Sequence, residues 1–550
     1  MDLNEASRSQ SKRLIEALER HATGHVGAAV EILKDGLRSE NASPEELRTL
    51  ARLALDVGDA PLAIQAAGQL LEKQPDDANG LSSFARAARQ LSSPESEPAR
   101  RRLEHKARTS SEAAFGRALL ALDVRAGSEA IPWLDLAVFL APEHVPARSL
   151  RAGCLVRAKR FSEARADYDK VLDHDPKQVR ALLGRARLNG MTGDFTAAEA
   201  DYRAILTLVP GYAPALSGLL GLNLADAEQL RRQSERALSG DRLLDGHRVE
   251  VLYALAKSYA NENRPKRAWT AARRANRYQA SNGQFDETGL RVQLALDRTF
   301  ISHTPKERDG PIDPCPVLVC GMPRSGTTLV ESILARHADV EAAGEVPFFR
   351  NAARWLGAQP EPAKALLSRR VELRRGYLAR LRAISPDASL VVDKMPENWR
   401  FLGLAHALLS SIPVVWVQRD PRDVAVSIYL EHFAPAESFA HDLGSITAMI
   451  KAQQDTLRFW LNDSSHRIVV VRYETLLHDP DAEIPRLLRE LGLAFDKNCL
   501  RPEEDDRPID TPSRWQVRQR LNTRSIGRWR NYEQFAPDRF KLLTDLAMQK

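Results

Sequence analysis

The feature that most constrains the fold is a 34-residue repeat in the first half of the chain. Pro142, Pro176 and Pro210 are 34 residues apart. Small and aromatic residues recur in the same register: Ala147, Ala181 and Ala215, Phe161 and Phe195, Ala164 and Ala198, and Tyr168 and Tyr202. A fixed period of this length is typical of architectures in which each unit buries its apolar face against its neighbours. The first half is therefore predicted to be a stack of similar units.

Each unit reads as two amphipathic helices. Residues 147–160 and 161–175 carry apolar residues at helical spacing, and the proline that follows cannot continue a helix. The recurring small residues fall where two helices must approach closely, and the aromatic residues fill the space between them. This unit resembles the tetratricopeptide repeat (TPR), and a generic helical bundle with coincidental spacing is the alternative. Looser copies occur around Gly58, Ala63 and Pro75, and around Ala254 and Ala268.

The TPR resemblance implies an α-helical solenoid over residues 1–299. Stacked repeats form a long concave surface, which most often binds a peptide or a protein. We therefore expect a peptide or protein partner, while a purely architectural role or a homodimer remains open.

The repeat pattern ends before residue 300. Residues 300–316 contain proline, glycine and charged residues without periodicity, which predicts a linker. Residues 317–550 alternate short β-branched runs with helical stretches, which predicts a parallel sheet covered on both faces and an overall α + α/β class. Ligands in such folds bind at the carboxyl ends of the strands. The predicted strands are 317–320, 389–392, 413–417 and 468–471, and the predicted helices begin near Thr327, span about 398–409, begin near Pro421, and follow Pro480.

The first predicted strand runs into a glycine-containing loop, GMPRSGTTL, at residues 321–329. Such a turn from strand to helix presents backbone N–H groups and the positive end of a helix dipole to a phosphate. The glycine spacing matches the P-loop of nucleotide triphosphatases, but Thr327 stands where that loop has lysine. The basic residue lies upstream, at Arg324. The loop resembles the 5′-phosphosulfate-binding loop of sulfotransferases that use 3′-phosphoadenosine-5′-phosphosulfate (PAPS), which implies that PAPS binds at Arg324, Ser325, Gly326, Thr327 and Thr328.

A second anion site is predicted after the strand 413–417. Arg419 lies at the carboxyl end of this strand, and Ser427 comes eight residues later, a little under two helical turns from Pro421. A guanidinium and a hydroxyl together can hold a phosphate monoester. The spacing resembles the 3′-phosphate-binding element of the same sulfotransferases.

Two features of this segment point the other way. Arg419 and Asp420 could instead pair with neighbours such as Arg422. Glu431 stands about where the tyrosylprotein sulfotransferase branch carries a further basic residue, which is a departure from the family pattern.

Sulfuryl transfer needs a base that deprotonates the acceptor and positive charge on the leaving phosphate oxygens. Glu345 lies 21 residues after Arg324 and matches the acid that serves as base in tyrosylprotein sulfotransferase-like enzymes. Lys394 follows the second predicted strand and would neutralise charge together with Arg324. His432 and Asp393 are competing bases. The sequence shows no cluster with metal-ligand spacing, so we expect no metal.

The resemblance implies further nucleotide contacts near the C-terminus. Tyr473, at the end of the fourth predicted strand, matches a tyrosine that contacts the nucleotide in this family. Residues 511–532 resemble the segment that closes over the co-substrate, so Ser513, Asn522 and Arg528 would reach PAPS. A charged, aromatic C-terminal helix is the alternative.

Composition and charge limit the classes of partner that we expect for this chain. The net charge of +6 is spread along the chain, which favours an anionic small molecule over nucleic acid. No apolar run approaches the ~20 residues that span a bilayer, and the N-terminal sequence lacks the apolar stretch of a secretory signal. Four sparse cysteines give no disulfide framework. We therefore expect a cytoplasmic protein without membrane or nucleic-acid partners.

These patterns together predict a TPR–sulfotransferase fusion that transfers a sulfuryl group from PAPS to an acceptor hydroxyl. Protein tyrosine is one candidate acceptor, and a carbohydrate, lipid or small-molecule hydroxyl would use the same base and donor. A P-loop kinase, which requires Mg²⁺ and ATP, is disfavoured by Thr327. A TPR scaffold with a non-catalytic nucleotide-binding domain is the third hypothesis, and it is disfavoured by the complete set Arg324, Glu345, Lys394, Arg419 and Ser427.

Overall fold

The chain forms two compact units, Met1–Arg248 and Val249–Lys550, which are described separately. The computed structural model describes residues 12–17, 26–38, 42–91, 93, 95–123, 127–222, 224–240, 245–280, 283–303, 312–386, 388–410, 412–434, 436–462, 467–505, 507 and 519–548. Residues 304–311 of the predicted linker 300–316 lie outside the described residues.

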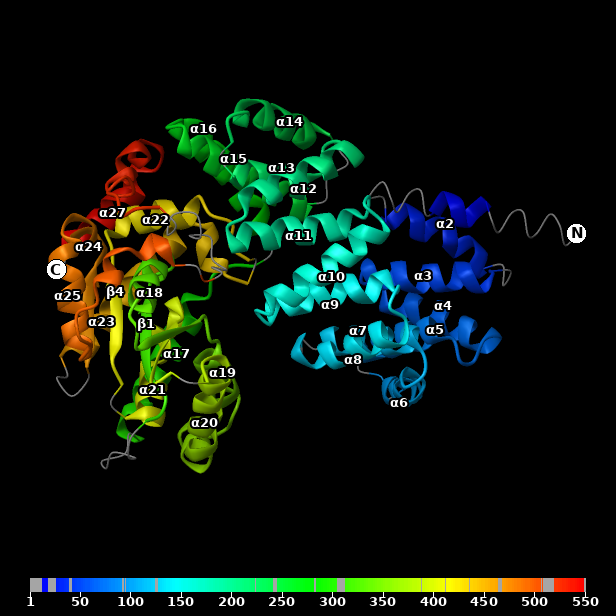
Figure 1. Ribbon diagram of the computed structural model, residues 1–550, viewed down its shortest axis with the longest axis horizontal. Coiled ribbons are helices and arrows are strands. Elements are labelled where there is room, and N and C mark those ends of the chain that lie inside the picture. The colour runs from blue at the N-terminus through cyan, green and yellow to red at the C-terminus, as the bar shows by residue number, and fades with distance from the viewer. Residues whose placement is uncertain are drawn as a thin grey trace, which may run out of the picture. The chain divides into compact units, whose positions relative to one another are not determined.

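The first unit is helical throughout its described part (Figure 1). Consecutive helices pack against one another in chain order, as expected for stacked repeats. Its helices are α2 (Val26–Arg38), α3 (Pro44–Asp56), α4 (Ala60–Lys73), α5 (Ala78–Gln90), α6 (Ser96–Ala107), α7 (Ser111–Asp123), α8 (Gly127–Leu140), α9 (Val145–Arg157), α10 (Phe161–His174), α11 (Val179–Thr192), α12 (Phe195–Leu208), α13 (Ala213–Gly221) and α14 (Ala227–Ser239).

Side-chain contacts repeat with the 34-residue period. The Arg151 guanidinium donates to Asp167, and Arg185, one period later, donates to Asp201. The recurring alanines are fully buried and the recurring tyrosines nearly so. The prediction of TPR-like helix pairs is therefore confirmed in α9–α12, where the period is strictest.

The close approach of neighbouring repeats gives a direct test of this packing. A Cβ added at Gly184 would lie 2.4 Å from the Tyr168 ring, whereas one added at Gly190, on the same helix, would meet nothing within 4 Å. Gly184→Ala is expected to lower the free energy of unfolding by about 1–3 kcal/mol through overpacking. Gly190→Ala is the matched control and should be neutral or stabilising by up to about 1 kcal/mol. Chemical denaturation measures both, and equal effects would contradict the packing.

The second unit contains a five-stranded parallel sheet with the order β2-β3-β1-β4-β5. The four predicted strands are confirmed within two residues at each end. The edge strand β2 was not predicted, because its sequence VEAAG contains one β-branched residue and reads as irregular. The strands are β1 (Cys315–Gly321), β2 (Val340–Gly344), β3 (Leu390–Lys394), β4 (Val414–Gln418) and β5 (Ile468–Arg472).

Helices cover both faces of this sheet (Figure 1). On one face, side chains of α18, α24 and α25 share a core with Val317, Val319 and Val415. On the other, Trp416 of β4 packs on Trp399, with ring centroids 6.5 Å apart. The helices after β1 are α18 (Thr327–Ala335), α19 (Phe348–Gly357), α20 (Pro362–Ile384), α21 (Leu402–Leu409), α22 (Pro421–Tyr429), α23 (Leu443–Leu461), α24 (Tyr473–His478), α25 (Pro480–Leu491) and α27 (Pro537–Met548).

The helix predicted over about 398–409 is only partly correct. Its first part, Pro396–Phe401, is a 3₁₀-helix, and the α-helix begins at Leu402. Asp297 lies at this junction and accepts hydrogen bonds from the backbone N–H groups of Gly403 and Leu404. The carboxylate thereby satisfies N–H groups at the start of α21 that have no partner within the helix.

Three helices that precede the sheet in sequence belong to its compact unit: α15 (Asp245–Asn261) from Val249 onward, α16 (Pro265–Ala280) and α17 (Glu287–Thr299). Trp269 of α16 packs against Tyr429 of α22, with ring centroids 4.6 Å apart, and Asp297 of α17 caps α21 as described. The domain boundaries at 299 and 317, drawn from the repeat pattern and the linker, stay predictions.

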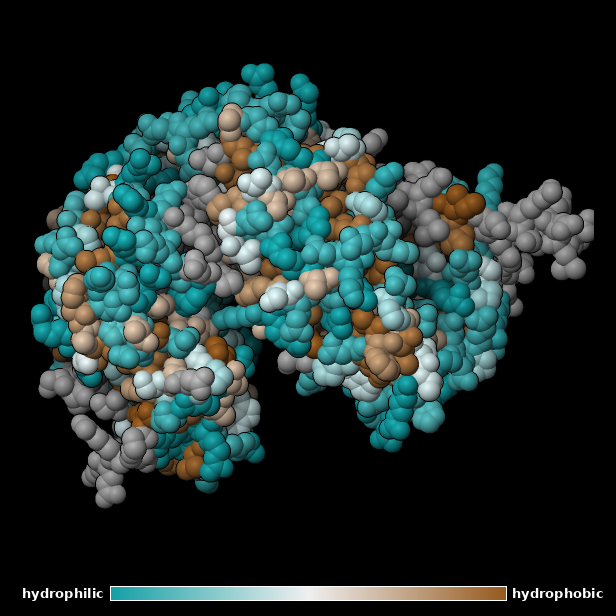
Figure 2. Space-filling model, viewed as in Figure 1, coloured by the Kyte–Doolittle hydropathy of each residue, from teal (hydrophilic) through white to brown (hydrophobic). Residues whose placement is uncertain are grey.

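The described surface is mixed in character. On the face shown in Figure 2, hydrophobic side chains lie in small groups among hydrophilic ones in both units. No helix in the described part of the chain combines the length and the apolarity that a bilayer crossing requires.

Candidate active site

The loop between β1 and α18 is shaped by residues with positive φ. Gly321, Arg324 and Gly326 have φ of 155°, 70° and 109°. A Cβ at Gly321 would lie 2.5 Å from the Val417 carbonyl oxygen, and one at Gly326 would lie 2.4 Å from the Tyr473 ring. The loop therefore lies close against β4 and α24, and only glycine fits at these two positions without a shift.

The loop leads directly into the N-terminus of α18. Gly326 is the N-cap residue and provides no side-chain cap, so the first N–H groups of the helix lack a side-chain acceptor from this position. Ser325, Thr327 and Thr328 are all buried at this helix start. The Ser325 Oγ is buried without a hydrogen-bond partner among the described residues.

The Arg324 side chain is 8% exposed and points toward α22 and the residues that follow it. Its Nε donates to the Ser427 Oγ at 3.1 Å, and its Nη2 lies 3.6 Å from the Glu431 Oε2. Burial lowers the pKa of Arg324, and the charges of Arg419 and Arg528 lower it further, which outweighs the opposing effect of Glu431. The predicted second anion element thus lies beside the loop arginine, with Ser427 contacting Arg324 itself.

Arg419 bridges the loop and the C-terminal segment. Its Nη1 donates to the Arg324 carbonyl oxygen at 3.0 Å and its Nη2 to the Ser525 carbonyl oxygen at 2.6 Å. Its guanidinium stacks on the Tyr473 ring at 4.5 Å, and the Tyr473 hydroxyl is 2.9 Å from the Ser525 Oγ. Its Nε is buried without a partner in the described part of the chain.

The alternative pairing with Arg422 is formed by Asp420 and not by Arg419. Asp420 forms an ion pair with Arg422 at 2.6 Å and caps α22 by accepting from the Arg422 backbone N–H. In the described part of the chain, Arg419 shares none of these contacts and donates to the carbonyl groups of Arg324 and Ser525.

Asp423 anchors the C-terminal segment, a role that the sequence did not suggest. Its carboxylate accepts hydrogen bonds from the backbone N–H groups of Gly527 and Trp529 at 2.6 and 2.9 Å. Burial raises the pKa of Asp423. The anchor fixes Arg528 between the two N–H groups, close enough for its charge to act on Arg324.

Of the remaining predicted nucleotide contacts, Asn522 is described and makes no contact with this cluster among the described residues. Asn522 is exposed and hydrogen bonds only locally, donating to the Arg520 carbonyl oxygen and accepting from the Arg524 N–H. Ser513 lies outside the described residues. Their proposed contacts with PAPS stay predictions.

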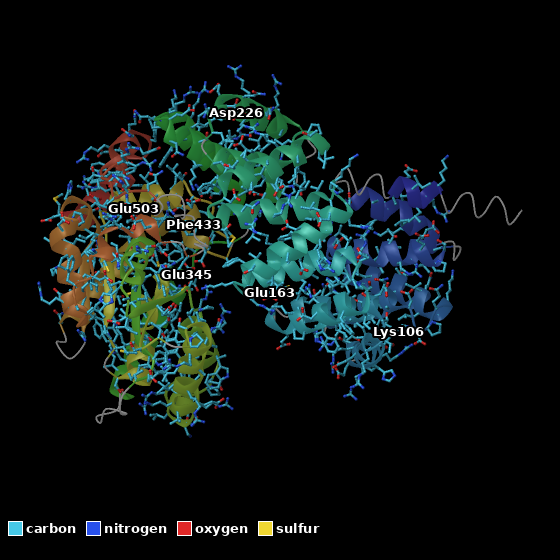
Figure 3. The ribbon with its side chains drawn as sticks, in the orientation of Figure 1. Lys106, Glu163, Asp226, Glu345, Phe433 and Glu503 are labelled. Atoms are coloured by element: carbon cyan, nitrogen blue, oxygen red, sulfur yellow. The ribbon has the colours of Figure 1, made fainter. Side chains whose placement is uncertain are left out.

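Glu345 and Lys394 form a close ion pair at the carboxyl ends of β2 and β3. The Lys394 Nζ lies 2.6 Å from the Glu345 Oε1 and 3.8 Å from the Glu331 Oε2 of α18. The Lys394 side chain is 1% exposed, whereas Glu345 is 44% exposed and is labelled in Figure 3. The Lys394 side chain is therefore buried, whereas the Glu345 carboxylate with which it pairs faces solvent.

The competing bases have different surroundings. Asp393 is fully buried, accepts from the Tyr377 hydroxyl at 2.9 Å, and has its pKa raised by burial to about 7. His432 stacks on Tyr253, with ring centroids 5.2 Å apart. Of the three candidate bases, Glu345 lies in the short segment between β2 and α19, where it pairs with Lys394 at the end of β3.

A cavity of about 720 Å³ reaches the loop from another side, between β4, β5, α22 and α23. Met322, Arg419 and Glu474 line it, while Arg324, Glu345 and Lys394 do not. Of the candidate site residues, Arg419 is the one that lines this cavity.

The cluster suits a ligand with two separate anionic groups. The loop and the start of α18 offer backbone N–H groups beside Ser325 Oγ. Arg324 donates to Ser427, Arg419 donates to the Arg324 carbonyl oxygen, and the charge of Arg528 acts on Arg324. Among the described residues, no group of three or more His, Cys, Asp or Glu side chains is placed to hold a metal ion.

The fold defines a P-loop-like α/β domain whose first strand-helix turn carries the candidate site. Residues 316–497 match the family described as "Sulfotransferase family", and residues 155–213 match the family described as "Tetratricopeptide repeat". The chain therefore carries a sulfotransferase-family domain behind tetratricopeptide repeats.

Several proteins share part of this sequence. An uncharacterized protein of Aquifex aeolicus is 32% identical over 257 residues, which is 43% of this chain and 34% of that protein, so the match spans about a third of that relative. A Caenorhabditis briggsae protein named "Putative protein-tyrosine sulfotransferase" is 24% identical over 42% of this chain and 85% of its own. The nodulation protein NoeE of Sinorhizobium fredii is 29% identical over 33% of this chain and 51% of its own.

Solved structures are similar to each part. The sulfotransferase domain of the Synechococcus PCC 7002 olefin synthase aligns with 45% of this chain and 98% of its own, at 19% identity and a TM-score of 0.34. A tetratricopeptide repeat protein of Parabacteroides merdae aligns with 49% of this chain and 92% of its own, at 18% identity and a TM-score of 0.28.

Proposed function

We propose that the protein transfers a sulfuryl group from PAPS to an acceptor hydroxyl. The observation that carries this proposal is the joining of two anion-binding elements: Arg324 of the loop donates to Ser427, and Arg419 donates to the carbonyl of Arg324. A site for two separate phosphate groups fits a donor that carries a 3′-phosphate as well as a 5′-phosphosulfate. Thr327 at the position of the P-loop lysine disfavours ATP as the donor.

The donor's 5′-group would bind the loop, and its 3′-phosphate would bind the arginine–serine cluster. In the first site the N–H groups of the loop and of α18, with Ser325, Thr327 and Thr328, would contact the 5′-group. In the second, Arg419, Ser427 and Arg528 would hold the 3′-phosphate, and Tyr473 orients Arg419 by stacking.

Bound PAPS supplies an activated sulfuryl group with a phosphate leaving group. Glu345, exposed at the end of β2, would accept the proton of the acceptor hydroxyl as its oxygen bonds to sulfur. Lys394 holds the Glu345 carboxylate in place, and its charge, with that of Arg324, would stabilise the negative charge that develops as the S–O bond to the leaving phosphate breaks. The residues proposed as directly catalytic are therefore Glu345, Arg324 and Lys394.

For the acceptor we propose a hydroxyl of a polypeptide, with protein tyrosine first. The name of the C. briggsae relative supports a tyrosine acceptor, and the repeats are suited to binding a peptide or a protein. The repeats would then select the substrate or a separate partner.

The proposal is tested by incubating the purified full-length chain with PAPS and a tyrosine-containing peptide, and following 3′-phosphoadenosine-5′-phosphate (PAP) by chromatography. PAP should form in step with sulfated peptide and without added Mg²⁺. Absence of PAP with peptide, carbohydrate and simple phenol acceptors alike would contradict sulfuryl transfer. PAP formation with a phenol or carbohydrate but not the peptide would contradict only the acceptor.

A further inference from the structure

The helix pair α15–α16 packs on the end of α22 and on the chain segment that follows it. Asn276 donates to the Tyr429 carbonyl oxygen at 3.0 Å and accepts from the Tyr253 hydroxyl at 2.6 Å. Gln279 donates to the carbonyl oxygen of Phe433, a residue labelled in Figure 3. Asn276 and Gln279 are 3% and 4% exposed, so these are enclosed contacts, which fix the backbone on both sides of Glu431.

Glu431 receives one cation from this helix pair and one from the phosphate loop. The Lys257 Nζ of α15 lies 3.5 Å from the Glu431 Oε2, and the Arg324 Nη2 lies 3.6 Å from the same oxygen. The Glu431 side chain is 14% exposed and that of Lys257 is 39% exposed. The acid that departs from the sulfotransferase pattern is thus shared between the loop arginine and a lysine from the helical region.

The charges around Glu431 decide how strongly it competes for Arg324. Burial alone would raise the pKa of Glu431, but the charges of Lys257 and Arg324 outweigh burial and lower it, so Glu431 is a carboxylate at neutral pH. A phosphate that approaches Arg324 must compete with this carboxylate for the guanidinium. Lys257 lies beside the same Glu431 oxygen as Arg324. Its positive charge partly offsets the charge of the carboxylate and so weakens the net attraction of Glu431 for Arg324.

We infer that Lys257 is a positioning residue of the donor site, which acts through Glu431 to leave Arg324 available for the donor's phosphate groups. The inference rests on the proposed function, because it takes PAPS as the donor. It makes the helix pair α15–α16 part of the nucleotide site rather than only a part of the repeat array.

Titration calorimetry with PAP tests the inference on the full-length chain. Lys257→Met should raise the Kd for PAP about 10-fold, because Arg324 is then the cation that faces the Glu431 carboxylate. Glu431→Gln should lower the Kd, because the competing carboxylate is gone. In the double variant the loss of Lys257 should change the Kd less than about 2-fold relative to Glu431→Gln, since neighbouring residues in one network are not additive. Lys257→Arg keeps the charge and should restore most of the affinity.

Lys266→Met is the matched control, because Lys266 is an exposed lysine of the same helix pair and should leave the Kd unchanged. Equal Kd values for the wild type and Lys257→Met would overturn the inference. A loss of affinity on removing Lys257 that persists in the Glu431→Gln background would also overturn it, since Lys257 would then act on the phosphate directly. Absence of PAP binding by the wild type would contradict the proposed function itself, and the inference with it.

Discussion

Replacing Glu345 by glutamine is expected to lower kcat for sulfuryl transfer by about 10²- to 10⁴-fold, the range that positioned general bases contribute. Glutamine keeps the shape and hydrogen-bonding capacity of the side chain but cannot accept the acceptor proton. Lys394 retains Glu331 as a partner at 3.8 Å, so its charge is not left alone in the interior. The Kd for PAP should therefore stay within about 2-fold of the wild-type value, and the measurement is the pair of kcat and Kd.

The matched control is Glu341→Gln. Glu341 is an exposed carboxylate on β2, the same strand that leads to Glu345, and its replacement should leave kcat unchanged. Wild-type kcat in Glu345→Gln would remove Glu345 from the base role and direct attention to His432 or Asp393. A parallel loss of kcat and PAP affinity would instead show that Glu345 supports binding.

Gly326→Ala is expected to raise the Kd for PAP about 100-fold or more. The new Cβ would lie 2.4 Å from the Tyr473 ring, and φ of 109° is a conformation that alanine rarely adopts. Either the loop or Tyr473 must move. Because the Arg419 guanidinium stacks on the Tyr473 ring, a shift of Tyr473 also displaces Arg419. Both proposed phosphate sites would therefore be disturbed by one methyl group, and calorimetry with PAP measures the loss.

Gly357→Ala is the control for this substitution, because a Cβ there meets nothing within 4 Å. Circular dichroism should show that both variants fold, with a loss of about 1–3 kcal/mol in the free energy of unfolding confined to Gly326→Ala. Unchanged PAP affinity in folded Gly326→Ala would mean that the close-fitting loop is not the nucleotide site.

Most of the fold could be predicted because the relevant patterns are local. The 34-residue period in α9–α12 and the β-branched runs of β1, β3, β4 and β5 are visible in the sequence itself. The strand β2 was missed because its alanines carry little strand preference and pairing with β3 decides its structure. The first part of the 398–409 helix was mistaken because a 3₁₀ turn and an α-helix share similar apolar spacing over six residues.

The proximity of several candidate residues was predictable, because these residues follow neighbouring parallel strands. The sheet order places β1 beside β3 and β4, so Arg324, Lys394 and Arg419 had to lie at one edge. Lys257 could not be found in this way, because α15 precedes the sheet by some 60 residues in the chain and resembles a repeat helix. Asp423 was also missed, because an acid in the first turn of a helix ordinarily serves the helix itself.

The most direct test of the central claim is a calorimetric titration of the wild type with PAP, ADP and ATP, with and without Mg²⁺. Arg419→Ala is titrated in parallel, with Arg422→Ala as the control because Arg422 pairs with Asp420 and not with the loop. We predict that PAP binds at least 10-fold more tightly than ADP or ATP, independently of Mg²⁺, and that only Arg419→Ala loses this preference. Preferential, Mg²⁺-dependent binding of ATP would contradict the account and favour a kinase.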